Sequence, residues 1–144
     1  MFRTVLVVCT GNICRSPMAE ALLRQAAPGL HVSSAGLAAL VGHPADAMAQ
    51  TLMAEKGLDV SGHRARQLTP EGVLGADLVL TMELGQQRAI ERAVPAARGK
   101  VQRLGRFGDF EVPDPYRRPR AAFEECLGLI ERGLAEFQDK MGWA

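Results

Sequence analysis

The apolar run RTVLVVC at residues 3–9 places the strongest constraint on the fold. It is rich in β-branched residues and does not alternate with polar ones, which is typical of a strand buried on both faces of a parallel sheet. Parallel neighbours must be joined by a crossover connection, usually a helix. The run therefore predicts an α/β fold with helices on both faces of the sheet.

The rest of the chain alternates between strand and helix patterns. Further strands are predicted near residues 31–34, 77–82 and 100–104. Helices are predicted from Ser16 and Pro17 to just before Pro28, and over residues 45–56, 84–93 and 119–141, with residues 105–118 as a loop. Right-handed β-α-β units then give a doubly wound sheet of four strands, in one domain covering residues 1–144.

Charge, hydropathy and cysteine content exclude several classes of protein. The net charge of +1 gives no general attraction to nucleic acid, and no apolar run is long enough to span a membrane. The three cysteines, Cys9, Cys14 and Cys126, are an odd number without regular spacing, unlike a disulfide framework. We expect reduced thiols in a cytoplasmic, monomeric protein with no nucleic-acid partner and no membrane insertion.

Cys9 ends the first predicted strand, at the sheet edge where such folds bind ligands. The loop after it contains Gly11 and Asn12, which tolerate left-handed backbone angles, and a helix follows. Successive N–H groups of such a loop, together with a helix N-terminus, can surround an anion of phosphate size. Arg15 adds a planar fork that can bind two phosphate oxygens. The phosphate-binding loop is predicted to comprise Thr10, Gly11, Asn12, Ile13, Cys14 and Ser16, with Arg15 as a catalytic residue that binds the phosphate.

In these surroundings Cys9 is predicted to ionise and act as a nucleophile. Attack on a bound phosphate ester would give a phosphocysteine intermediate. A small buried apolar role is the alternative for a cysteine in a strand. A nucleotide-binding Walker loop is disfavoured because GNICRS lacks the second Gly and the Lys-Ser/Thr pair. Zinc would need ligands beyond Cys9 and Cys14, so no metal or cofactor is expected.

The segment CTGNICRS, residues 9–16, resembles the signature of the low-molecular-weight protein tyrosine phosphatases. Asp114-Pro115-Tyr116 resembles this family's acid loop, and SAGL (residues 34–37) and HRARQLT (residues 63–69) also match. The resemblance covers essentially the whole chain. It implies a flavodoxin-like fold with strand order 2-1-3-4, a metal-free mechanism and phosphotyrosine as the substrate group.

The resemblance also implies residue roles. Asp114 is the expected general acid and then base, and Tyr116 is an expected wall of the substrate cleft. The other wall carries Leu40 where animal members carry an aromatic residue, a difference that resembles the bacterial branch. Members of that branch act on tyrosine autokinases of exopolysaccharide export, so such a kinase is the implied partner. A hydrogen-bond network supporting the loop is implied for Asn12, Ser16, Ser34 and His63.

Several readings stay open. Arg117, Arg118 and Arg120 follow the acid loop and either attract acidic phosphorylated tails or form a solvated face. Cys14 is predicted to form a protective disulfide with Cys9 under peroxide. His31 and His43 are expected to be structural, and Cys126 to lie in the core. The competing functions are a thiol-dependent redox enzyme similar to arsenate reductases and a phosphotyrosine-binding module without turnover.

Overall fold

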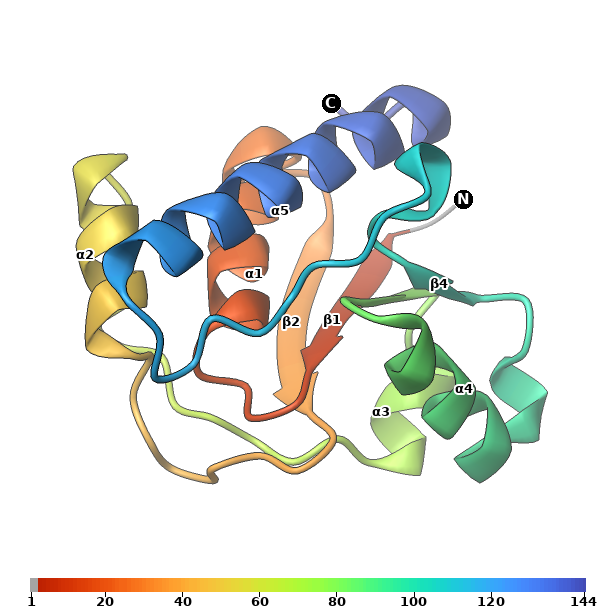
Figure 1. Ribbon diagram of the computed structural model, residues 1–144. Helices are drawn as coiled ribbons and strands as arrows, with labels where there is room; N and C mark the ends of the chain where they lie inside the picture. Colours follow the sequence, from red (N-terminus) through yellow and green to blue (C-terminus); the bar gives the residue numbers. More distant parts are fainter. Residues whose placement is uncertain (1–2) are drawn as a thin grey trace.

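Four parallel strands form the centre of the computed structural model, which describes residues 3–144 (Figure 1). They are β1 (Thr4–Cys9), β2 (His31–Gly36), β3 (Leu78–Thr81) and β4 (Val101–Arg103). Their order in the sheet is β2-β1-β3-β4, and each pair of neighbours is parallel. The predicted α/β class and strand order are confirmed, although residues 1–2 of the predicted domain lie outside the described residues.

Helices cover both faces of this sheet. They are α1 (Arg15–Ala26), α2 (Ala47–Glu55), α3 (Pro70–Gly75), α4 (Leu84–Ala93) and α5 (Arg120–Met141), with short 3₁₀ helices at Pro95–Ala97 and Arg106–Gly108. The long helix α5 crosses α1 on one face together with α2, and α3 and α4 lie apart from them (Figure 1). The bounds predicted for the helix at residues 84–93 are those observed for α4.

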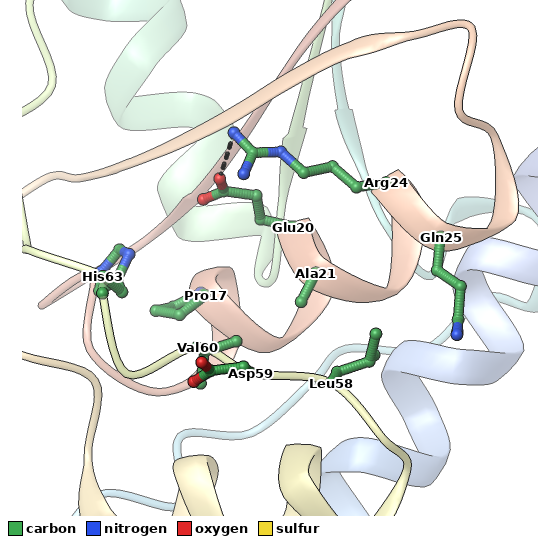
Figure 2. A pocket seen from close by; sticks show the side chains of 10 residues that line it. Pro17, Glu20, Ala21, Arg24, Gln25, Leu58, Asp59, Val60 and His63 are labelled. Atoms are coloured by element: carbon green, nitrogen blue, oxygen red, sulfur yellow. Dashed lines mark ion pairs between the residues drawn. The ribbon is translucent and has the colours of Figure 1, made fainter.

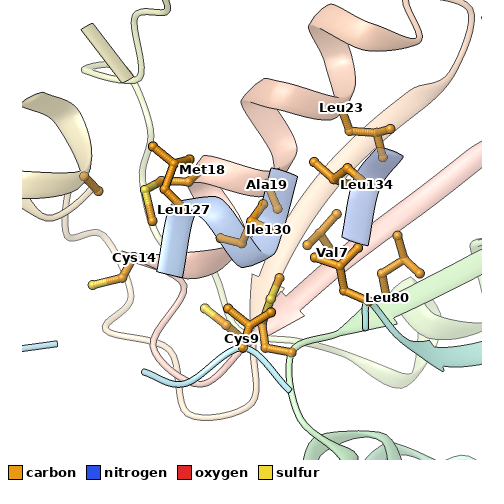
Figure 3. Packing of buried hydrophobic residues seen from close by; sticks show 14 of the residues in the cluster. Val7, Cys9, Cys14, Met18, Ala19, Leu23, Leu80, Leu127, Ile130 and Leu134 are labelled. Atoms are coloured by element: carbon orange, nitrogen blue, oxygen red, sulfur yellow. The ribbon is translucent and has the colours of Figure 1, made fainter. Parts of the chain in front are cut away.

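The central strand β1 is buried on both faces, as its sequence predicts. Val5, Val7 and Cys9 belong to the core beneath α1 and α5, whereas Leu6 and Val8 belong to the core beneath α3 and α4. This division follows from the two-residue period of a strand. Figure 3 shows Val7 and Cys9 in the first core, close to Ile130 and Leu134 of α5.

Helix α5 buries the apolar stripe predicted for it. The buried members are Phe123, Leu127, Ile130, Leu134 and Phe137. Gly133 allows the helix to approach the loop after β4, because a Cβ atom at this position would lie 2.7 Å from the Leu104 side chain and 2.9 Å from its carbonyl oxygen. The helix therefore packs directly on the segment that leads to residues 105–118.

The short helix α3 was not predicted. Thr69 caps it by accepting a hydrogen bond from Gly72 N at 3.1 Å, and Pro70 occupies its first turn. These are ordinary start signals, but six residues are too few to show the apolar periodicity of a helix. Its buried Val73 contributes to the second core.

Candidate active site

The loop after β1 leads directly into the N-terminus of α1. The helix begins at Arg15, and its N-cap residue, Cys14, makes no side-chain capping hydrogen bond. Ser16, predicted as part of the start signal, is instead the second helical residue. Since the first N–H groups of a helix have no partner within it, this end offers donors and partial positive charge to an anion.

The carbonyl oxygens of the loop are bonded to segments outside it. Those of Cys9, Thr10 and Gly11 accept from Leu37, Ala38 and Leu40 N at 3.0, 2.9 and 3.1 Å, respectively. The Ile13 oxygen accepts from Asp46 N at 2.8 Å, and the Asn12 oxygen binds His63 Nε2 at 2.7 Å. In a trans peptide the N–H group points opposite to the C=O group. The outer contacts therefore turn the loop N–H groups inward.

Two residues make this tight curvature possible. The first is Asn12, whose φ of 59° lies in the left-handed region. Gly11, which was expected to allow such an angle, does not have a positive φ. Gly36, at the end of β2, lets that strand approach the loop, because a Cβ atom there would lie 2.6 Å from the Thr10 carbonyl oxygen.

Cys9 is 2% exposed, and its Sγ atom lies 2.9 Å from Ser16 Oγ. Either atom of this contact can donate, because a hydroxyl and a thiol each carry a proton. Asn12 Nδ2 donates to Ser16 Oγ at 2.7 Å, so the serine proton is available to Cys9.

The predicted network around Asn12 comes together and is larger than predicted. Asn12 Nδ2 also donates to Ser34 Oγ at 3.0 Å, and Ser34 Oγ donates to Glu20 Oε1 at 2.5 Å. Asn12 Oδ1 accepts from Arg66 N at 2.9 Å. Glu20 and Arg66 were missed, since neither carries a recognisable motif and both contacts join segments distant in sequence. Every polar side-chain atom of Asn12 is therefore engaged.

Arg15 is 1% exposed and is held from several sides. Its Nη1 donates to a Glu83 carboxylate oxygen and to the Val112 carbonyl at 2.8 Å, and its Nη2 lies 3.5 Å from Thr10 Oγ1. Burial opposes its charged form, but the Glu83 hydrogen bond and the charges of Cys9 and Asp114 raise the pKa of Arg15 on balance.

Glu83 and Gln86 were also missed by the sequence prediction. They form a capping box at the start of α4, and Gln86 Nε2 donates to Thr10 Oγ1 at 3.2 Å. Their position in the sequence could have identified them, because Glu83 follows β3 and therefore lies at the same sheet edge as Cys9. The N-terminus of α4 thus fixes both Arg15 and Thr10.

A cleft of about 170 Å³ brings together the residues predicted from opposite ends of the chain. Asp114 Oδ2 lies 3.7 Å from Arg15 Nη2, and Asp114 Oδ1 accepts from Tyr116 N at 3.1 Å. Leu40 and Tyr116 are 37% and 39% exposed and form part of the walls. The lining is Cys9, Thr10, Gly11, Ile13, Cys14, Arg15, Ala38, Leu40, Asp114 and Tyr116.

Cys14 and Cys126 differ from a reactive thiol in their protonation. Burial, followed by the charge of Asp46, raises the pKa of Cys14 well above its ordinary range. Burial likewise raises the pKa of Cys126 to about 12. Both are therefore neutral thiols near neutral pH, and Cys126 lies in the core as predicted.

The arginines after the acid loop separate into two groups. Arg120 binds both oxygens of Glu55 on α2, at 2.9 and 2.7 Å, and so belongs to the contact between α2 and α5. Arg117 has φ = 63° and places its guanidinium 5.4 Å from the centre of the Tyr116 ring. Only Arg117 and Arg118 stay candidates for contacts with a substrate tail.

Within residues 3–144, no three His, Cys, Asp or Glu side chains gather in a group that could hold a metal ion. In the same part of the chain, none of the helices has the length and apolar content needed to cross a membrane.

Comparison with known proteins finds close relatives. The chain is 54% identical over 134 residues to the probable low molecular weight protein-tyrosine-phosphatase EpsP of Ralstonia nicotianae, covering 93% of this chain and 92% of that one. Among solved structures, Vibrio vulnificus Wzb in complex with benzylphosphonate superimposes with a TM-score of 0.93 at 41% identity, covering 97% of this chain and 99% of that chain.

A third relative has a different named activity. The YwlE arginine phosphatase from Geobacillus stearothermophilus has a TM-score of 0.83 and 39% identity, covering 96% of this chain and 94% of that chain. The family model for low molecular weight phosphotyrosine protein phosphatases matches residues 4–142. With the phosphate loop, the buried arginine and the acid loop in one cleft, this match shows that the chain belongs to the low molecular weight phosphotyrosine protein phosphatase family.

Proposed function

We propose that this protein is a protein-tyrosine-phosphatase that hydrolyses phosphotyrosine through a phosphocysteine intermediate. One observation carries the proposal: Cys9, Arg15 and Asp114 line a single cleft that is walled by Leu40 and Tyr116. A nucleophile, an anion-binding group and a proton donor are the parts that ester hydrolysis needs. The residues that supply them lie in one chain, so we propose that a monomer of one phosphatase domain, residues 1–144, suffices.

The first step is attack of the Cys9 thiolate on phosphorus. The inward N–H groups of the loop and the Arg15 guanidinium bind the nonbridging oxygens and balance their charge. The sulfur–phosphorus bond forms as the bond from phosphorus to the phenolic oxygen breaks. Asp114 donates its proton to that oxygen, so tyrosine leaves as a neutral phenol.

The second step is hydrolysis of phosphocysteine. Asp114, now a carboxylate, accepts a proton from the attacking water, whose oxygen binds phosphorus as the sulfur–phosphorus bond breaks. The departing thiolate receives the hydrogen bond that Ser16 offers to Cys9 Sγ, with 2.9 Å between the heavy atoms. The cycle ends with inorganic phosphate, Cys9 thiolate and protonated Asp114.

The depth of the cleft favours phosphotyrosine as substrate over phosphorylated residues with shorter side chains. Cys9 is 2% exposed at its base, whereas Tyr116 is 39% exposed at its mouth, so the substrate must reach inward. An aromatic ring spans that depth and can stack on Tyr116. As partner we propose a tyrosine autokinase of exopolysaccharide export, and as location the cytoplasm, where thiols stay reduced.

Phosphoarginine is a second candidate substrate because one similar structure is an arginine phosphatase. Its side chain is cationic at the group next to phosphorus, and the walls Ile13, Leu40 and Tyr116 are apolar or aromatic. Asp114 is the one carboxylate in the lining of this cleft. This lining supports an aryl ester better than a guanidinium. A redox relay is disfavoured because Cys126 is buried and its pKa is raised to about 12.

Hydrolysis assays with matched substrates test the proposal. We expect wild type, with EDTA present, to hydrolyse phenyl phosphate and phosphotyrosine peptide faster than phosphoarginine peptide, and Cys9→Ser to be inactive. Asp114→Asn should lower kcat/KM, which reports the steps up to phenol release, by about 10²-fold or more for phenyl phosphate, whose leaving group needs a proton. It should lower kcat/KM much less for p-nitrophenyl phosphate, whose leaving group is more acidic.

Turnover by Cys9→Ser equal to wild type would contradict the proposed nucleophile. Equal losses for the two aryl phosphates in Asp114→Asn would contradict the proposed acid, and faster cleavage of phosphoarginine would favour the second candidate.

A further inference from the structure

A second and larger cavity, of about 610 Å³, lies outside the phosphate cleft. Figure 2 shows it between the outer side of α1, which contributes Pro17, Glu20, Ala21, Arg24 and Gln25, and the loop of residues 58–63. Of the residues that line the catalytic cleft, none lines this cavity. Its volume is in the range of pockets that bind small molecules.

The charges around this cavity are unequal. The lining contains two carboxylates, Glu20 and Asp59, and one guanidinium, Arg24. Arg24 is already engaged, since its Nε and Nη2 atoms donate to the Val32 carbonyl at 3.1 and 2.7 Å and its Nη2 lies 2.8 Å from Glu20. The surplus charge is therefore the negative charge of Asp59.

Asp59 is fixed as a carboxylate at the rim of the cavity. Its Oδ1 accepts from Ser61 N at 2.8 Å, and the hydrogen bonds from Ser61 hold the pKa of Asp59 below its usual value. The neighbouring lining is apolar, with Pro17 and Ala21 on α1 and Leu58 and Val60 on the loop. Carboxylate and apolar wall together suit a cation attached to an apolar body.

Two residues of the cavity also hold the phosphate loop. Glu20 accepts from Ser34 Oγ at 2.5 Å, and Ser34 Oγ accepts from Asn12 Nδ2 at 3.0 Å. His63 Nε2 lies 2.7 Å from the Asn12 carbonyl, which can only accept, so Nε2 carries the proton. The cavity is thus joined to Asn12 by two short paths.

We propose that this cavity is an effector site for a small organic cation, an ammonium group on an aryl or alkyl body. The ammonium pairs with Asp59 and Glu20, and the apolar body contacts Leu58 and Ala21. A cation beside Glu20 weakens that carboxylate as an acceptor for Ser34, which loosens Asn12 and the phosphate loop. Binding therefore lowers kcat without competing with substrate, a regulation that goes beyond the proposed catalytic function.

Titration with benzylammonium chloride at constant ionic strength tests the site, with benzyl alcohol as the uncharged control. Backbone amide NMR measures binding without relying on catalysis. We expect saturable shifts at residues 17–25 and 58–63, retained when excess inorganic phosphate occupies the catalytic cleft. At saturation, p-nitrophenyl phosphate turnover should show a kcat lowered by about fivefold and an unchanged KM.

Three variants sharpen the test. Asp59→Asn keeps an acceptor for the Ser61 turn and should weaken the affinity by about threefold to fivefold, as for loss of one partly exposed ion pair. Asp139→Asn is the matched control, because it removes an exposed carboxylate on α5 outside the cavity lining. Ala21→Leu should weaken binding by filling the cavity without changing a charge. Each variant should keep its basal kcat.

Absence of saturable shifts in these segments would overturn the site, as would equal affinities of Asp59→Asn and Asp139→Asn or equal binding of benzyl alcohol. Saturable binding with unchanged kcat would overturn the coupling to the phosphate loop. Purely competitive inhibition, with shifts abolished by phosphate, would place the probe in the catalytic cleft and overturn the proposal. Each of these results differs from inactivity of the wild type, which would refute the catalytic function instead.

Discussion

Asn12 shapes the phosphate-binding loop through both its backbone and its side chain. It has a left-handed φ of 59°, and its side chain binds Ser16, Ser34 and the Arg66 backbone. An amide side chain has two N–H donors and one carbonyl acceptor, and each has a partner here. Sequence alone predicts the turn residue and its family role, but not which way each of its polar atoms faces.

A Ser16→Ala variant tests whether Ser16 donates a hydrogen bond to Cys9 Sγ. Because its hydroxyl is the donor left for Cys9 Sγ, Ser16→Ala should slow the step in which thiolate leaves phosphocysteine. A loss of one such hydrogen bond lowers kcat by about tenfold. We expect a pre-steady-state burst of p-nitrophenol release when Ser16→Ala is mixed with p-nitrophenyl phosphate in a stopped-flow instrument. Ser34→Ala, which contacts Asn12 rather than Cys9, is the control and should show a smaller burst; a linear time course in Ser16→Ala would contradict the assignment.

Cys14 tests the predicted redox protection. It is buried, and its raised pKa makes it a neutral thiol that does not compete with Cys9 as nucleophile. Cys14→Ser should hydrolyse aryl phosphate within about threefold of wild type, since the thiol itself takes no part in the chemistry. After peroxide treatment, dithiothreitol should restore wild type but little of the variant, whose Cys9 proceeds to irreversible oxides. Full recovery of Cys14→Ser would show that Cys14 protects nothing.

At the scale of elements, α1 and α4 present their N-termini to the phosphate site in different ways. The first is left without a side-chain cap, whereas the second is closed by Glu83 and Gln86, which at the same time bind Arg15 and Thr10. The strands and long helices were predictable because their apolar periods are local. The contacts of Glu83 with Arg15 and of Gln86 with Thr10 were not, since they join residues 68 and 76 positions apart in the chain.

Helix α5 offers a matched pair of glycines. A Cβ atom at Gly133 would collide with Leu104, whereas one at Gly128 would meet nothing within 4 Å. Gly133→Ala should lower the free energy of unfolding by about 1–3 kcal/mol through overpacking. Gly128→Ala should raise it by about 0.5–1 kcal/mol, because alanine is the better helix former. Urea denaturation followed by circular dichroism measures both; equal signs of the two changes would contradict the packing described for α5.

The start of β1 gives a pH-dependent prediction. Asp77 Oδ2 accepts from Arg3 N and Thr4 N at 2.9 and 3.0 Å, and these bonds lower the pKa of Asp77 from its ordinary 3.8. A depressed pKa stabilises the fold above the unfolded value, and the contribution is lost as pH falls through the folded value. Asp77→Asn should therefore be less stable than wild type at pH 6, with the gap closing below about pH 4. A gap in melting temperature that is unchanged from pH 6 to pH 3 would refute this.

At the scale of the whole molecule, the site exists because separate segments meet at one edge of the sheet. Cys9 ends β1 and Arg15 begins α1, Leu40 comes from the loop after β2, and Asp114 and Tyr116 come from the loop before α5. The sequence identifies that edge through strand direction and identifies the acid loop through family resemblance. It does not reveal the Glu20 and Arg66 contacts, because side-chain orientation across the fold decides them, or the short helix α3, because six residues are too few to show a helical apolar period.

Arg117 and Arg118 bear on recognition by the whole surface. If they bind acidic phosphorylated tails, affinity for such a tail should depend on salt more steeply in wild type than in an Arg117→Ala/Arg118→Ala double variant. Binding of a tyrosine-phosphorylated acidic peptide to Cys9→Ser proteins, measured between low and high NaCl, checks this. Arg120→Ala is the control, because Arg120 is engaged with Glu55. Identical salt slopes would assign Arg117 and Arg118 to a solvated face.

The central claim is that Cys9 becomes phosphorylated during turnover. Acid quenching of wild type within milliseconds of mixing with phosphotyrosine peptide, followed by peptide mass spectrometry, measures this directly. We expect one phosphoryl group on the peptide that contains Cys9, with a larger phosphorylated fraction in Ser16→Ala and none in Cys9→Ser. Steady turnover with the phosphoryl group on another residue, or with none detectable on Cys9 even in Ser16→Ala, would contradict it.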